Sequence, residues 1–92
     1  MVRKLSKPQA IADRLSSALA RGDTASFTAA LMKIVKERGM TSMARQIGVS
    51  RHTLYRYEWG TDRPLLETAV KMTTACGFKL MVVPQQDTPR DK

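Results

Sequence analysis

The sequence contains almost none of the residues on which disulfides and metal centres depend. Among its 92 residues it has one cysteine, Cys76, and one histidine, His52. One cysteine cannot form a disulfide within the chain, and one cysteine with one histidine is too few for a zinc site. We therefore expect no metal and no cofactor, and we expect Cys76 to pack in the core rather than to act in redox chemistry.

Long apolar runs and catalytic signatures are missing as well. No apolar stretch approaches the roughly 20 residues that span a bilayer, and the first residues lack the apolar segment of a secretory signal. The sequence shows no nucleophile beside a recognisable base, no glycine-rich loop after a strand and no paired carboxylates. These absences favour a cytoplasmic protein that is not an enzyme.

Acidic residues are scarce relative to basic ones. The chain has 8 acidic and 16 basic residues, which gives a formal net charge of +8 at pH 7. Such an excess indicates a polyanionic partner, which can be nucleic acid, an anionic membrane or an acidic protein surface. The alternative is a solvated basic surface that serves solubility alone.

The length and the hydrophobic fraction indicate one small globular domain. A chain of 92 residues with 42% hydrophobic residues is expected to form a single domain over residues 1–92. A domain of this size has a small core, so we expect it to associate into an oligomer. The terminal segments 1–5 and 85–92 are expected to be flexible.

Five segments combine the apolar periodicity of helices with residues that begin or end them. The expected helices run from Ser6 to Arg21, from Asp23 or Thr24 to Arg38, from Thr41 to Ile47, from Ser50 to Trp59 and from Pro64 to Gly77. The residues expected to face inward on the first, second and last helices are Ile11, Leu15, Ala18, Leu19, Phe27, Ala30, Leu31, Ile34, Val35, Leu65, Leu66, Ala69, Met72 and Cys76. The sequence therefore predicts an all-α fold of five helices.

After Gly77 the residue pattern changes from helical to strand-like. Residues 78–83 form a short apolar run, and Pro84 ends it. A lone strand cannot satisfy its own backbone groups, so we expect one short C-terminal strand that pairs with the same strand of a second copy. The alternative way to form the homodimer is helix packing near Trp59 or through the last helix.

The segment from Thr41 to Trp59 has the pattern of a central helix-turn-helix. Ala44 is small, as a close helix crossing requires, and four residues later Gly48 can adopt the positive φ of a tight turn. Ser50 can accept hydrogen bonds from the first amides of the second helix. The apolar residues that would lock the pair together are Met43, Ile47, Val49, Leu54 and Tyr57. The simpler alternative is a pair of packed helices joined by a glycine turn.

The second helix of this pair carries hydrogen-bond donors for base edges. Arg51 and His52 lie in its first turn, which is the part that usually meets bases, and Arg56 lies one turn further on the same face. Arginine can bind guanine through two hydrogen bonds. The candidate DNA-binding residues are Thr41, Arg45, Ser50, Arg51, His52, Thr53, Tyr55 and Arg56. For each residue the alternative is an exposed, solvated side chain.

Part of this segment resembles a known DNA-binding family. The residues that carry the resemblance are Gly48 to Leu54, Glu58, Gly60 and Pro64. They are similar to the helix-turn-helix of phage repressors and Cro proteins. In that family the first, second and sixth residues after the cap read bases, which implies this role for Arg51, His52 and Arg56. The resemblance implies a repressor-like domain that binds double-stranded DNA at a palindromic operator.

A second resemblance extends over residues 11–83. The residues that carry it are Ala18 to Asp23, Gly39 to Arg45, Gly48 to Arg51, Thr53 to Arg56, Pro64, Thr68 and Gly77 to Leu80. They resemble the small antidote proteins of toxin–antitoxin addiction modules whose toxins are HigB/RelE-like mRNA interferases. This implies a homodimeric DNA-binding antitoxin that neutralises its cognate toxin and represses its own operon. The alternatives are a stand-alone phage-type transcriptional regulator and a helix-turn-helix that serves protein interaction alone.

Overall fold

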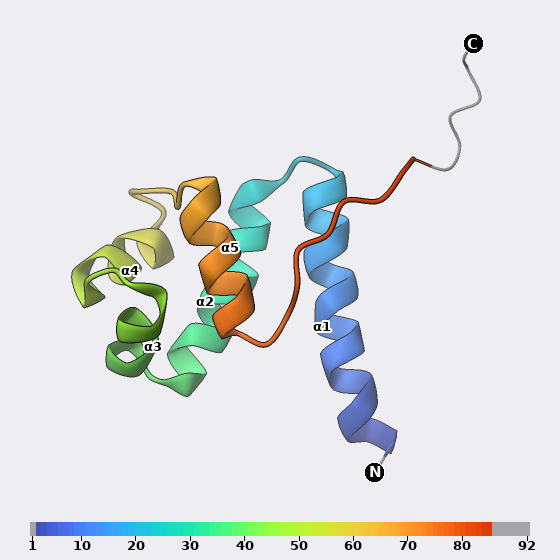
Figure 1. Ribbon diagram of the computed structural model, residues 1–92, viewed down its shortest axis with the longest axis horizontal. Helices are drawn as coiled ribbons and strands as arrows, with labels where there is room; N and C mark the ends of the chain where they lie inside the picture. The colour runs from blue at the N-terminus through green and yellow to red at the C-terminus, as the bar shows by residue number, and fades with distance from the viewer. Residues whose placement is uncertain (1, 86–92) are drawn as a thin grey trace.

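Five α-helices form the part of the chain that the structure describes. The structure, a computed structural model, describes residues 2–85, with side chains from residue 7 onward. The helices are α1 (Val2–Ala20), α2 (Thr24–Arg38), α3 (Met40–Ile47), α4 (Arg51–Trp59) and α5 (Leu66–Ala75) (Figure 1). The prediction of an all-α fold of five helices is confirmed, and none of the described helices has both the length and the apolar character to cross a membrane. Of the ends predicted to be flexible, residue 1 and residues 86–92 lie outside the described residues.

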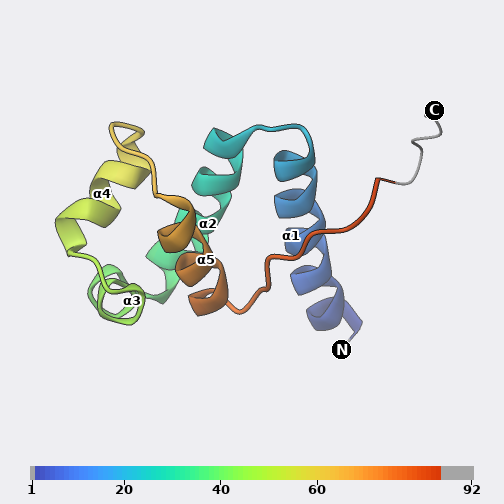
Figure 2. The same ribbon diagram turned by 45° about the horizontal axis from the view of Figure 1, so that its top comes forward.

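The helix α2 lies at the centre of the fold. It contacts each of the other four described helices, whereas α1 contacts no described helix except α2. α1 lies on one side of α2, and α3 and α4 lie on the other side (Figures 1 and 2). α5 packs against α2 and α3. This order leaves α3 and α4 at the end of the molecule that is farthest from α1.

Buried apolar side chains from all five helices form one core. Its members are Leu15, Ala18, Phe27, Leu31, Met32, Val35, Met43, Ala44, Ile47, Leu54, Tyr57, Met72 and Cys76. Of the fourteen residues predicted to face inward on α1, α2 and α5, seven are buried and four are half-buried, because one helical face recurs every three to four residues. The other three are exposed, among them Leu19 at 38%. Cys76 packs in this core as predicted, and its burial raises the pKa of the thiol above its usual value.

The prediction that Leu65 and Leu66 face inward is wrong. Leu65 is 74% exposed and Leu66 is 77% exposed. The helix α5 begins at Leu66 and not at Pro64, and Leu65 is its N-cap with an extended backbone. Leu65 therefore precedes α5 and Leu66 lies in its first turn, while Met72, further along the helix, is fully buried.

Two other helices also begin at residues that differ from the predicted ones. α1 begins at Val2 and not at Ser6, so Pro8 lies inside the helix, where it removes one backbone hydrogen bond without ending the helix. α3 begins at Met40 rather than at Thr41, because Gly39 turns the chain with a φ of 108° and serves as the N-cap. Thr41 is thus a residue of the first turn of α3, and its hydroxyl is free to bind elsewhere.

The predicted C-terminal strand is not formed in the described residues. After α5 the chain runs without regular structure across the side of α1 (Figures 1 and 2). Phe78 and Leu80 are half-buried against the core, whereas Met81 and Val82 are 75% and 98% exposed. A strand requires a neighbouring strand whose backbone it can pair with. The described part of this chain offers none, so the segment is attached to the domain through alternate side chains instead.

The two methionines Met72 and Met81 give a matched test of this packing. Met72→Ala should lower the free energy of unfolding by about 2–5 kcal/mol, because it leaves a cavity in the core. Met81→Ala removes the same atoms from an exposed position and should change stability by less than about 0.5 kcal/mol. Urea denaturation of both variants measures the difference. An equally large loss for Met81→Ala would mean that the C-terminal segment is packed after all.

Candidate nucleic-acid interface

The helices α3 and α4 and the turn between them are built by local interactions that the sequence predicts. Gly48 ends α3 in the left-handed conformation, with a φ of 88°, and its N–H donates to the carbonyl oxygen of Ala44 at 2.8 Å. Ser50 is the N-cap of α4, and its Oγ accepts the N–H of Thr53 at 3.0 Å. The end of α3 at Ile47, the turn over residues 48–50 and the extent of α4 to Trp59 agree with the prediction.

Apolar contacts lock these two helices together, and we call residues 40–59 the α3–α4 unit. The buried side chains of this unit are Met43, Ala44, Ile47, Leu54 and Tyr57. Val49, in the turn, is half-buried against the same core. Burial of Tyr57 raises the pKa of its hydroxyl, and the negative charge of Asp62 adds to this effect. The tyrosine is therefore neutral at physiological pH and serves packing.

An ion pair joins the α3–α4 unit to the central helix. Lys36 of α2 donates from Nζ to Oε2 of Glu58 on α4 at 2.7 Å. This hydrogen bond, together with the charge of Glu58, raises the pKa of Lys36 above its usual value. The two side chains are 54% and 27% exposed, so the pair is screened by water and adds little stability by itself. It connects the last turn of α4 to α2.

Basic side chains are exposed on both helices of the α3–α4 unit. Arg45 lies in the last turn of α3, whereas Arg51 and His52 lie in the first turn of α4, and all three are exposed. Nη1 of Arg51 donates to Oγ1 of Thr41 at 3.0 Å, which ties the first turn of α4 to the first turn of α3. Thr41, predicted as a helix cap, therefore holds an arginine instead. The side chain of Arg51 is nevertheless exposed to solvent.

The other predicted site residues of α4 are half-buried. Oγ1 of Thr53 lies 2.9 Å from Oγ of Ser50, so both hydroxyls belong to the cap of the helix. The ring of Tyr55 stacks on that of Trp59, with centroids 5.8 Å apart and an angle of 26° between the planes. The structure therefore brings Thr41, Ser50, Arg51 and Thr53 together at the start of α4. Tyr55 lies one turn further along the helix, where its ring contacts Trp59.

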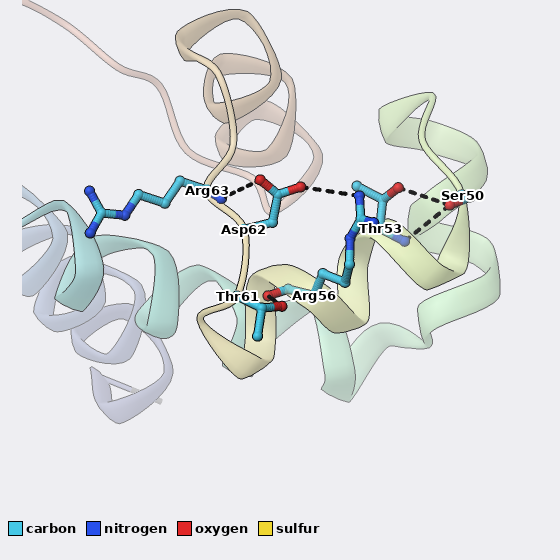
Figure 3. Close-up of polar contacts among 6 residues, drawn as sticks. All are labelled: Ser50, Thr53, Arg56, Thr61, Asp62 and Arg63. Carbon is cyan, nitrogen blue, oxygen red and sulfur yellow. Dashed lines mark hydrogen bonds and ion pairs between the residues drawn. The ribbon is translucent and has the colours of Figure 1, made fainter.

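Arg56 is bound by the loop that follows α4. Its Nη2 lies 3.2 Å from Oδ2 of Asp62, and the two side chains are 43% and 44% exposed (Figure 3). Asp62 also accepts the backbone N–H of Arg63 through Oδ1 at 2.9 Å. The sequence reasoning missed Asp62, because helical periodicity ends at Trp59 and gives no position to a loop residue. The only signal was an acidic residue next to a basic one, six positions after Arg56.

The described residues offer no site for a metal ion. Among them, no three or more histidine, cysteine, aspartate or glutamate side chains lie close enough together to bind one. The exposed start of α4 presents donors on a helix that is fixed by its cap, its core contacts and the pair with α2, which is an arrangement suited to an extended polar ligand.

Comparison with known proteins gives one match. A family model described as "Probable addiction module antidote protein" matches residues 1–84. Neither the search of curated proteins nor the search of solved structures found a match. An antidote is the partner of a cognate toxin in such a module, so the family supplies an antitoxin role. Because the family model spans nearly the whole sequence, the chain belongs to the family of probable addiction module antidote proteins.

Proposed function

We propose that this antitoxin is a homodimeric, sequence-specific DNA-binding protein that represses its own operon and neutralises a HigB/RelE-like toxin in the cytoplasm. In this proposal the α3–α4 unit is a helix-turn-helix, and the protein acts by binding, without catalysis. The observation that carries the proposal is the exposed first turn of α4, which presents Arg51 and His52 from a helix fixed by core contacts.

The contacts of Arg51 support a role in base reading. Its Nη1 is occupied by Thr41, which holds the guanidinium in one direction and reduces the conformational entropy that binding would cost. The other guanidinium donors remain available for O6 and N7 of a guanine. His52 is exposed beside it and Arg45 is exposed on α3, which provides further donors for bases or phosphates.

The charge of the chain supports DNA as the ligand. A net charge of +8 attracts the phosphate backbone over a long range, and this term supplies most of the affinity that does not depend on sequence. A helix-turn-helix used for protein interaction alone would not require exposed arginines at the start of α4. A stand-alone phage-type regulator would share the DNA-binding surface, but the family match favours an antitoxin.

Dimerisation follows from the small size of one recognition helix. A single helix contacts only a few base pairs, whereas two helices related by a twofold axis read two half-sites about 34 Å apart. Since the predicted strand is not formed, we assign the dimer contact to the exposed apolar start of α5. Leu65, Leu66 and Val70 are 74%, 77% and 42% exposed, and we call them the α5 patch.

A second copy of this chain is the occupant that fits the α5 patch. Leu66 and Val70 are four residues apart and lie on the same side of α5. The patch directly follows the loop that leaves α4 (Figure 1), so a twofold contact here joins the two copies next to their α4 helices. Large apolar side chains on successive turns are unusual on the surface of a monomer.

Arg51→Ala should weaken binding to the DNA upstream of the gene by about 1–3 kcal/mol, because it removes a base contact. Arg14→Ala removes the same charge from α1, at the opposite end of the molecule, and should have a smaller effect on operator binding. Gel-shift titration measures both affinities, and thermal unfolding checks that both variants are folded. Equal losses in the two variants would show that Arg51 contributes charge alone.

Leu66→Asp should convert the dimer into a monomer and reduce operator affinity, because it puts a charge into the α5 patch. The substitution does not disturb the single chain, since Leu66 is exposed and an acidic residue suits the first turn of a helix. Val82→Asp adds the same charge at a residue that is 98% exposed in the C-terminal segment and should leave the dimer intact. Sedimentation velocity distinguishes the two variants. A monomeric Val82→Asp protein beside a dimeric Leu66→Asp protein would assign the dimer to the C-terminal segment.

The toxin class is tested with the gene adjacent to that of this chain. Expression of the adjacent gene alone should arrest growth and cut mRNA, which primer extension detects, because HigB/RelE-like toxins are mRNA interferases. Co-expression of this chain should restore growth, whereas a copy with an early stop codon should not. An adjacent product that forms no complex with the chain and causes no arrest would favour the stand-alone regulator.

A further inference from the structure

The ion pair between Arg56 and Asp62 lies in the candidate site, but the proposed function gives it no role. Arg56 lies on α4, one turn after the exposed first turn, and Asp62 lies in the loop between α4 and α5. Figure 3 shows the guanidinium of Arg56 joined to the carboxylate of Asp62. The nitrogen Nη2 is 3.2 Å from the carboxylate oxygen Oδ2.

Backbone contacts fix the carboxylate before any ligand arrives. Oδ1 of Asp62 accepts the N–H of Arg63, and Oδ2 accepts the hydrogen bond from the arginine. The carbonyl oxygen of Arg56 accepts the N–H groups of Thr61 and Asp62 at 3.1 and 3.3 Å, and the hydroxyl of Thr61 at 3.3 Å. The loop therefore contacts both the carbonyl oxygen and the guanidinium of Arg56. Among the described residues, the hydrogen bond to Oδ2 of Asp62 is the contact that directs the guanidinium.

The guanidinium itself is only partly satisfied. Its Nε is buried and has no hydrogen-bond partner among the described residues, while the side chain as a whole is 43% exposed. Without Asp62, the hydrogen bonds described for this part of the chain would leave the side chain without a polar partner that sets its direction. A long arginine in that condition samples many rotamers and binds any phosphate within reach.

We propose that Asp62 is a specificity-determining, positioning residue of the DNA-binding surface. It holds Arg56 in one orientation, from which the remaining N–H groups reach one base edge, and it offsets the charge that would otherwise bind phosphates of any sequence. Specificity is a difference between two affinities, and a carboxylate beside a basic site lowers the non-specific one. The inference rests on the proposed DNA-binding function.

The experiment compares Asp62→Asn with Asp13→Asn. Both substitutions remove one negative charge through the same isosteric change, but Asp13 lies on α1, where it accepts only a hydrogen bond from Gln9 among the described side chains. Fluorescence anisotropy measures the Kd of each protein for the DNA upstream of its gene and for a scrambled fragment of equal length, at several salt concentrations. Thermal unfolding confirms that each variant is folded.

Asp62→Asn should bind the scrambled fragment more tightly than the wild type, with a steeper salt dependence. Its ratio of specific to non-specific affinity should fall about fivefold or more, because an aligned base contact contributes at least that much discrimination. Asp13→Asn should change both affinities by the same factor and keep the ratio. In a chain that also carries Arg56→Ala, Asp62→Asn should no longer change the ratio, since the two residues act as one unit.

Two results would overturn the inference while the proposed function stands. One is an Asp62→Asn protein whose ratio equals that of Asp13→Asn. The other is an effect of Asp62→Asn that persists in the Arg56→Ala chain, because Asp62 would then act independently of the arginine. A wild-type protein that binds the upstream and the scrambled fragments equally well would contradict the proposed function itself, and this inference with it.

Discussion

The packing of α2 against every other described helix is the constraint on which the rest of the structure depends. Its buried face, with Leu31 and Val35 almost inaccessible to water, is the only helical surface that all four neighbours share among the described residues. α1 is attached to the domain through α2 and the half-buried Phe78 and Leu80 of the C-terminal segment. α4 is attached through buried Leu54 and the Lys36–Glu58 pair. The orientation of the α3–α4 unit is therefore a consequence of the core.

The parts of the fold that sequence could predict are those determined by neighbouring residues. Gly48 and Ser50 act on amides and carbonyls within five residues of themselves, so the bounds of the turn follow from residue type alone. The start of α5 depends instead on where the preceding loop places Leu65, and no local signal records this. The same limit applies to residues 78–83. Their strand-like composition indicates a segment that is not helical, but it does not reveal whether a partner strand is present.

The candidate site shows the same division at the level of side chains. The residue types at the start of α4 indicated donors for base edges, and the structure places Arg51 and His52 on the exposed face. The contacts that orient the arginines come from elsewhere, from Thr41 on α3 and from Asp62 in a loop. Such contacts join residues ten and six positions apart and depend on how two elements cross, so periodicity within one helix cannot reveal them.

In the proposed function, the distribution of charge separates affinity from specificity. A net charge of +8 attracts the protein to DNA of any sequence. Further positive charge would strengthen binding to every non-specific site and so slow the search for the specific one. Two of the cations near the α3–α4 unit, Lys36 and Arg56, are paired with carboxylates of the same domain, so they add little to that general attraction. Arg51 is held by a neutral hydroxyl instead and keeps its full charge. The surface thus combines one arginine that is both oriented and fully charged with one that is oriented and largely neutralised. The two arginines differ in the charge that they offer to phosphates, but both side chains have a fixed orientation. Discrimination between DNA sequences then depends on the orientation of these side chains towards the base edges.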